Sequence, residues 1–351
     1  MRRARRVFFP LDEQLGLSDK HYSEGVLKEM VWLSGAVNSF AEAEQVFERI
    51  GKVVISDSSI WRRKEEWGEQ FREVEAAQRE KANVLSSGQA FRERVLGSEK
   101  RLGVSMDGTM VHIRDEGWKE LKVGCCFQIE VWPTWNKETQ EWEDLAHAVD
   151  NAYVAHLGGA ELLGQMLWAE AKQRGWEGAK DREVVGDGAP WVWNTAQDYF
   201  YDAKQVVDWY HAMEHLAGIA ALLHGEGTPA TKRWYKSAET ALYQGHAERL
   251  AREVEEMARA YPEEVAAELQ KEAGYLDKHK RRMQYLEMRE EGYVIGSGMV
   301  ESGGKQFKSR FCGPGMRWSR AGIERLIPIR AAIMSNRFDT TWEAVYNSPP
   351  N

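Results

Sequence analysis

The stretch that decides the fold is "VVGDGAPWVWN" at residues 184–194. It opens on two valines typical of a buried strand, and Gly-Asp-Gly then ends that strand at an acid, Asp187. Pro190 follows where the first turn of a helix accepts proline. An earlier stretch, "LGVSMDGTMVHI" at residues 102–113, also sets apolar residues around an Asp-Gly pair, at Asp107. The sequence therefore predicts two strands that each carry an aspartate beside a glycine.

The residues around these stretches predict an α/β core over residues 101–225. "RLGVSMDGTMVHIR" and "GWKELKVGCCFQIEVW" are rich in β-branched and aromatic residues and contain turn signals, which predicts three consecutive antiparallel strands. A helix over 158–176, the strand of Asp187, a helix from Pro190, and a strand and helix over 203–223 follow. The predicted order is β-β-β-α-β-α-β-α, a mixed sheet with helices.

Two further regions follow the first part of this core. Residues 226–292 are polar and helical with no strand pattern, which predicts an all-α insertion. Residues 293–351 hold a Gly/Ser loop, a helix that carries Glu301, and basic C-terminal helices, and we expect them to complete the core.

Residues 1–100 predict a helical N-terminal region with a candidate helix-turn-helix. Apolar residues repeat at three and four through residues 20–50, and a short turn leads to a second helix with Ile60 and Trp61 facing inward. Basic side chains on the outer face of that second helix would contact DNA, namely Arg62, Arg63 and Lys64. An ordinary helical hairpin with a solvated charged face is the alternative.

Composition predicts a folded protein of more than one domain. The chain has 351 residues, 43% hydrophobic and 29% charged. It has no apolar run of about 18 residues, so we expect no membrane partner. Three cysteines, two of them adjacent, form neither a disulfide framework nor a zinc site, which indicates a reducing compartment and predicts a cytoplasmic protein.

Charge is distributed unevenly along the chain. The net charge of −8 argues against a protein that coats nucleic acid. Residues 302–330, however, have seven basic side chains against one acid, Glu324, a local net charge of +6. Those basic residues are Lys305, Lys308, Arg310, Arg317, Arg320, Arg325 and Arg330. A polyanion would therefore bind locally.

Three acids stand beside glycines at the ends of predicted elements: Asp107, Asp187 and Glu301. Strand ends are where ligands bind in α/β folds, and three converging carboxylates repel one another unless a cation neutralises them. A hard divalent cation takes oxygen ligands, and two such ions suit phosphodiester chemistry. Each acid also has a simpler interpretation, because Asp-Gly forms turns and glutamate is favoured at a helix N-terminus.

The ordered motifs resemble the RNase H-like DDE transposases, and most closely the ISKra-type bacterial insertion-sequence transposases related to the Mutator group. The matching pieces are "SMDGTMV", "VVGDGAPWVWN", "GSGMVESGGKQFKSRF" and "DWYHAMEHL", in which Asp208 and His211 match a D-x-x-H motif. The likeness runs from "RRVFFPLDEQLGL" to "GPGMRW".

This resemblance implies an RNase H-like core interrupted by the helical insertion, and a metal-dependent DNA transposase. Asp107, Asp187 and Glu301 would hold Mg²⁺ or Mn²⁺, as two ions. Water would attack a transposon-end phosphodiester, and the freed 3′-hydroxyl would then attack target DNA. His211 would position or stabilise a phosphate or a carboxylate. The implied partners are the terminal inverted repeats and target DNA, bound by a homodimer or higher oligomer that is associated with the nucleoid when on DNA.

Basic residues after Glu301 fit phosphate binding. Lys305, Lys308 and Arg310 follow the acid directly and would hold phosphates near the scissile bond, although a solvated helix face is the alternative. Arg317 and Trp318 are further candidate DNA contacts. Relatives carry a cysteine-rich segment ahead of the "FPLDE" lead, which this chain lacks, so either the gene is truncated or residues 20–67 recognise the DNA ends.

Two other functions compete with a transposase. A catalytically inactive descendant would keep the fold and bind DNA without cutting it. A glycoside hydrolase would use two of the acids and need no metal.

Overall fold

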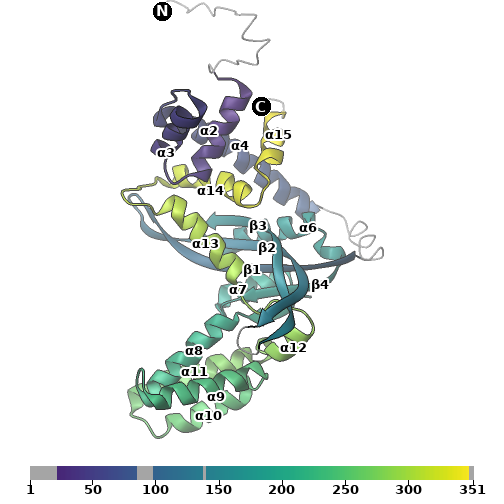
Figure 1. The fold of residues 1–351 in the computed structure, drawn as a ribbon, viewed down its shortest axis with the longest axis vertical. Helices are drawn as coiled ribbons and strands as arrows, with labels where there is room; N and C mark the ends of the chain where they lie inside the picture. The colour runs from purple at the N-terminus through teal and green to yellow at the C-terminus, as the bar shows by residue number, and fades with distance from the viewer. Residues whose placement is uncertain (1–21, 85–97, 137–139, 348–351) are drawn as a thin grey trace, which may run out of the picture. The chain divides into compact units, whose positions relative to one another are not determined.

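A computed structural model describes residues 22–84, 98–136 and 140–347 (Figure 1). The described part is a mixed α/β protein with a five-stranded sheet in the order β3-β2-β1-β4-β5. The "RRVFFPLDEQLGL" lead lies outside the described residues.

The order of elements predicted for residues 101–225 is confirmed, with one added 3-10 turn. The strands and helices follow one another as β1 (Ser98–Ile113), β2 (Gly117–Asn136), β3 (Glu141–Leu157), α6 (Ala160–Gln173), the 3-10 turn Trp176–Gly178, β4 (Ala179–Gly186), α7 (Pro190–Tyr199), β5 (Lys204–Val207) and α8 (Trp209–His224). The apolar strand residues fill the core, and Val104, Val184 and Val185 are completely buried. Pro190 occupies the first turn of α7.

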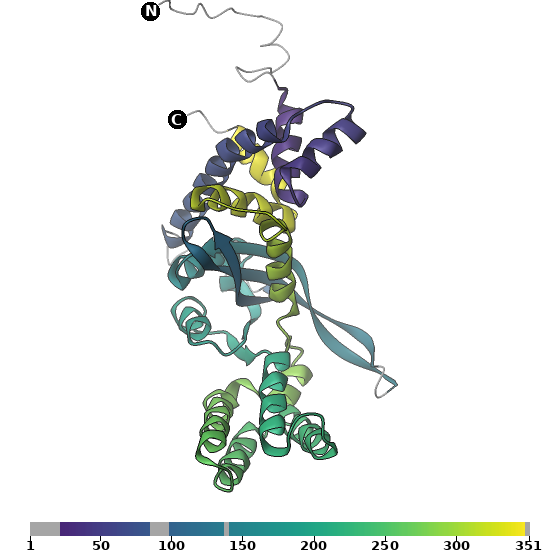
Figure 2. The ribbon, with the colours of Figure 1, turned by 90° about the vertical axis from the view of Figure 1, so that its left-hand side faces the viewer.

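The sheet combines parallel and antiparallel pairs. β4 pairs in parallel with both β1 and β5, whereas β2 pairs antiparallel with β3. Because only three residues join β1 to β2, this pair is antiparallel too. The β2–β3 pairing continues as far as Asn136 and Glu141, and Figure 2 shows this end projecting from the sheet as a two-stranded ribbon.

Helices fill the chain after α8, and no strand is found in the described residues beyond β5. The segment from residue 229 to 290, called here the helical segment, holds α9 (Pro229–Tyr243), α10 (Ala247–Ala258), α11 (Glu263–His279), the 3-10 turn Lys280–Arg282 and α12 (Tyr285–Glu290). Figures 1 and 2 show α8 running beside these helices. The chain then forms α13 (Gly298–Phe311), α14 (Arg320–Met334) and α15 (Phe338–Tyr346).

The chain divides into two compact units that differ from the contiguous domains expected from the sequence. One, the terminal unit, contains the described residues of 1–78, 110–119 and 306–351. The other, the sheet unit, contains those of 79–109 and 120–305. The turn between β1 and β2 therefore belongs with the N- and C-terminal helices, because Arg320 binds Glu116 there through two hydrogen bonds and Ile113 bridges to Trp318.

The terminal helices differ from the predicted helix-turn-helix. The predicted helix over residues 20–50 is broken into α2 (Glu24–Ala36) and α3 (Phe40–Val46), which a π-helical turn Phe47–Gly51 extends. The break occurs because Ser39 caps α3, accepting a hydrogen bond from the Glu42 N–H at 3.0 Å, while the Glu42 carboxylate accepts one from the Asn38 N–H.

The second predicted helix, α4 (Asp57–Val84), buries a different face from the one expected. Its buried stripe consists of Ile60, Lys64, Trp67 and Phe71, spaced at four, three and four. Trp61, expected to face inward, is 45% exposed, and Lys64, expected to face outward, is completely buried. The assignment of these two side chains from sequence was therefore wrong.

Among the described residues, none of the helices combines the length and apolar character needed to cross a membrane.

Candidate active site

Three aspartates lie level with one another on neighbouring parallel strands. Asp187 and Asp208 directly follow the ends of β4 and β5, whereas Asp107, predicted at a strand end, lies within β1, which continues to Ile113. From Arg101 to Ser105, partners on β1 and β4 differ by 80 in residue number, and partners on β4 and β5 differ by 21. Continued by one or two residues, these registers set Asp107 beside Asp187 and Asp187 beside Asp208. Level residues on neighbouring strands point to the same face of a sheet, so the two predicted aspartates and Asp208 share one face.

Asp107 is half-buried among other acidic groups. Burial raises the pKa of its carboxyl, and the nearby carboxylates of Asp187 and Glu301 raise it further. The Gly108 N–H, which donates to Asp107 Oδ1 at 2.7 Å, and the nearby His211 act in the opposite direction. Asp107, Asp187, Glu301 and His211 are therefore close enough to interact electrostatically.

Asp187 stands in a turn that fixes both its main chain and its carboxylate. Its Oδ1 accepts a hydrogen bond from the Ala189 N–H at 2.8 Å, which holds the carboxylate over the start of α7. Gly188 has φ +99°, a conformation that favours glycine. The Gly-Asp-Gly stretch thus forms the turn that the sequence predicts, with Asp187 half-buried at the strand end.

Asp208 caps α8 and orients His211. Its Oδ1 accepts hydrogen bonds from the His211 N–H at 2.8 Å and the His211 Nδ1–H at 3.0 Å, while Oδ2 accepts one from the Ser297 N–H. Burial alone would raise the pKa of Asp208, but these bonds lower it. The same contact raises the pKa of His211 to about 9, with additional help from Asp187 and Glu214. This contact therefore favours the protonated form of the His211 ring.

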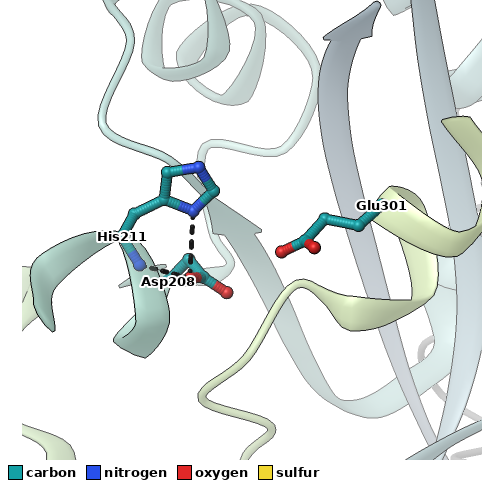
Figure 3. Close-up of side chains that lie close together, drawn as sticks. All are labelled: Asp208, His211 and Glu301. Carbon is teal, nitrogen blue, oxygen red and sulfur yellow. Dashed lines mark hydrogen bonds and ion pairs between the residues drawn. The ribbon is translucent and has the colours of Figure 1, made fainter. Parts of the chain in front are cut away.

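Glu301 approaches this pair from the first turn of α13 (Figure 3). Asp208, His211 and Glu301 each offer a ligand atom within 4.8 Å of the others. Tyr153 positions the helix, because its hydroxyl donates to the Met299 carbonyl at 3.1 Å and a Cβ on Gly303 would lie 2.5 Å from its ring. The Ser297 hydroxyl donates to Glu301 Oε1 at 3.3 Å.

The carboxylates differ in their capacity to bind a cation. Asp208 already accepts three N–H bonds and is completely buried, which leaves its carboxylate fewer lone pairs for a metal than the other acids have. Asp107, Asp187 and Glu301 are half-buried and retain lone pairs for an ion. Their mutual repulsion at Asp107 is what a divalent cation such as Mg²⁺ or Mn²⁺ would offset. Of these three predicted ligands, only Glu301 belongs to the group within 4.8 Å.

The predicted DNA-contacting residues fall into two sets. The exposed set is Arg62, Lys305, Lys308 and Arg317, together with the partly exposed Arg63. Arg63 pairs with Glu66 at 3.0 Å, and Lys305 lies 3.7 Å from Glu301. The side chains of this set are accessible to solvent.

The buried set is Lys64, Arg310 and Trp318, and it holds the terminal unit together. Lys64 Nζ donates to the Gly322 carbonyl at 2.9 Å, and the Trp318 indole N–H donates to the Phe311 carbonyl at 2.9 Å. Arg310 donates to the Ser34 carbonyl at the end of α2 at 2.8 Å, where a cation is favoured. Burial lowers the pKa of Arg310 to about 10. Assigning these three residues to DNA contact does not fit their position.

The basic stretch 302–330 is consequently less of a surface patch than its charge indicates. Arg330, like Arg310, is buried, and its Nη1 donates to the Gly35 carbonyl at 3.0 Å. Arg325 pairs with Glu65 and Glu69 at 2.8 Å each. Three of the basic side chains behind the local charge of +6, Arg310, Arg325 and Arg330, therefore bind carbonyls or carboxylates within the terminal unit.

No family model matches the sequence, and no curated protein matches it either.

Sequence reasoning placed Asp208 in a motif but not among the site residues. Its role as the residue that orients His211 follows from the hydrogen bonds at the start of α8. The D-x-x-H spacing contains the signal, because an aspartate three residues ahead of a histidine is the spacing of a helix N-cap and its third residue.

Proposed function

We propose that this protein is a DNA transposase of an insertion sequence, with an RNase H-like core and a metal-dependent DDE site formed by Asp107, Asp187 and Glu301. The single observation that carries the proposal is the level row of aspartates on three neighbouring parallel strands, Asp107 within β1 and Asp187 and Asp208 directly after β4 and β5. Glu301 and His211 lie near Asp208 and interact electrostatically with Asp107. A mixed sheet flanked by helices agrees with that core.

The chemistry proposed is cleavage of a phosphodiester at a transposon end, followed by transfer of the freed 3′-hydroxyl to target DNA. One or two Mg²⁺ or Mn²⁺ ions would supply Lewis acidity and positive charge. Asp107, Asp187 and Glu301 would hold these ions. His211, protonated and anchored by Asp208, would bind a phosphate oxygen beside the carboxylates and limit their repulsion.

DNA would be held by exposed cations rather than by the whole basic stretch. Lys305 and Lys308 follow Glu301 on α13, and Arg62 and Arg317 are exposed in the terminal unit. We expect the protein to act on terminal inverted repeats as a homodimer or higher oligomer in the bacterial cytoplasm. Contacts of this kind make binding strongly dependent on salt.

The test is cleavage of a labelled DNA duplex that carries the ends of the flanking element. We expect nicking at the ends with Mn²⁺, none with EDTA, and none with Asp187→Asn, which keeps the size of the side chain and removes its charge. Asp198→Asn, an exposed aspartate at the end of α7, is the matched control and should cleave normally. Retained binding without cleavage in the wild-type protein would instead indicate an inactive DNA-binding descendant.

A further inference from the structure

The turn that carries Asp187 is held by a tyrosine from the helical segment. The Tyr275 hydroxyl, on α11, donates a hydrogen bond to the main-chain carbonyl of Asp187 at 3.0 Å. The two residues are 88 positions apart in sequence, so the contact joins distant parts of the sheet unit. It acts on the main chain of Asp187, while the Ala189 N–H holds the carboxylate.

Gly188 is shaped to admit this phenol. A Cβ at Gly188 would lie 2.7 Å from the Tyr275 hydroxyl oxygen, so any larger residue would displace the ring or the turn. Glycine is thus needed here both for its φ of +99° and for the close approach of Tyr275. The turn at Asp187 and the Tyr275 side chain are therefore packed directly against each other.

Tyr275 itself packs against two histidines. Its ring stacks on His215 of α8 with 3.7 Å between centroids, and His215 Nδ1–H donates to Glu272 Oε2 at 2.5 Å. His279 lies 4.8 Å from Tyr275 between centroids. Residues from α8 and α11 therefore set the position of the phenol.

Arg282 links His279 to β5 and α7. Arg282 Nη1 donates to His279 Nδ1 at 3.2 Å, and because a guanidinium only donates, His279 must accept there as a neutral ring. Arg282 also donates to Gln205 of β5 at 2.7 Å and lies 4.4 Å from the centroid of the Trp193 ring on α7. A continuous column of rings and polar groups thus joins the helical segment to the strands and helix around Asp187.

We propose that Tyr275 is a positioning residue for Asp187, through which the helical segment holds the second acid in its metal-binding position. The assignment rests on the proposed function, since it gives a role to the part of the chain that lies between Asp187 and Glu301. Tyr275 touches no reacting atom in this scheme. Its effect is exerted on the geometry of the turn, and hence on the affinity for metal.

The test compares two tyrosine-to-phenylalanine variants. Tyr275→Phe keeps the ring stacked on His215 and removes only the hydrogen bond to Asp187. Tyr261→Phe is the matched control, because the Tyr261 hydroxyl donates to the Leu223 carbonyl at 2.6 Å within the helical region and has no contact with Asp187. Both variants lose one tyrosine-to-carbonyl hydrogen bond, so a merely structural role predicts the same result for both.

Two quantities are measured: the dissociation constant for Mn²⁺ by calorimetry without DNA, and kcat and KM for end cleavage. We expect Tyr275→Phe to weaken Mn²⁺ binding and lower kcat by about 3–10-fold with KM for DNA unchanged, whereas Tyr261→Phe matches the wild type. Equal values for Tyr275→Phe and the wild type would overturn the positioning role while leaving the transposase proposal intact. A wild-type protein that neither binds Mn²⁺ nor cleaves DNA would refute the proposed function and this role with it.

Discussion

Replacing Lys64 with methionine separates a structural lysine from a DNA-contacting one. Lys64 is completely buried in the terminal unit and donates to the Gly322 carbonyl at 2.9 Å and to Glu65 at 2.5 Å. Its Nζ lies 5.8 Å from the centroid of the Phe40 ring and 5.7 Å from that of Trp318. Methionine fills nearly the same volume without the charge. The substitution therefore isolates the polar contacts.

The expected magnitude comes from two opposing effects. The Gly322 carbonyl loses its buried donor, which costs about 1–3 kcal/mol, whereas Glu65 keeps Arg325 as a partner at 2.8 Å. Burial lowers the pKa of Lys64, so removing the ammonium also relieves a desolvation cost and reduces the loss. We expect the free energy of unfolding to fall by about 1–2 kcal/mol.

The assay is urea unfolding, paired with DNA binding at a temperature where the variant is fully folded. Lys64→Met should be less stable and bind DNA with unchanged affinity. Arg62→Ala changes an exposed position two residues earlier and should keep the free energy of unfolding within about 0.5 kcal/mol of the wild type. It should lower the slope of log binding constant against log salt concentration by about one. A Lys64→Met protein of normal stability and weakened DNA binding would refute the burial of this side chain.

Three further predictions concern the sheet unit. Gly188→Ala should lower stability by about 1–3 kcal/mol and reduce end cleavage, because alanine meets both a φ of +99° and the Tyr275 hydroxyl; wild-type activity in this variant would contradict that packing. Burial raises the pKa of Glu183, whose Oε1 accepts no hydrogen bond from the described residues. The free energy of unfolding of the wild-type protein should therefore fall as pH rises above about 4.5. Glu183→Gln should remove this pH dependence in unfolding measurements. Burial and Arg282 lower the pKa of His279 to about 4. The stability that the neutral ring provides should therefore be present above about pH 6.5 and lost as pH falls towards 4. His279→Gln should weaken this dependence of the free energy of unfolding on pH.

Local sequence patterns predicted the sheet well because strand and helix signals alternate clearly along residues 101–225. Apolar β-branched runs, the Asp-Gly turn at residue 187 and the proline at 190 each specify a local conformation, and the element order follows from them. The position of Asp187 directly after a strand was readable for the same reason, whereas Asp107, predicted at a strand end, lies within β1. That the two aspartates lie level with each other could not be predicted, because it depends on the register between strands, which local sequence patterns do not specify.

The faces of α4 show why the N-terminal expectation failed. Three adjacent basic residues suggested an outward face, but adjacent residues on a helix point in different directions. The spacing of Ile60, Trp67 and Phe71 passes through Lys64, so the buried stripe could have been read from the sequence. The partners that make burial of an ammonium tolerable, such as the Gly322 carbonyl, come from the other end of the chain.

Tyr275 illustrates the contacts that sequence reasoning cannot reach. Nothing around residue 275 distinguishes this tyrosine from others in the helical segment, and its partner lies 88 residues away. Only the packing of α11 against α8 brings its hydroxyl to Asp187. Long-range hydrogen bonds of this kind depend on tertiary structure rather than on local propensity.

The location of bound Mn²⁺ in a crystal of the protein tests the central claim most directly. Anomalous scattering at the manganese edge identifies the ion independently of activity. We predict a peak at direct ligand distance from the carboxylates of Asp107 and Asp187, with Glu301 completing the site and Asp208 still bonded to His211. A peak coordinated by Asp208 and His211, or no peak near any of these acids, would contradict the account.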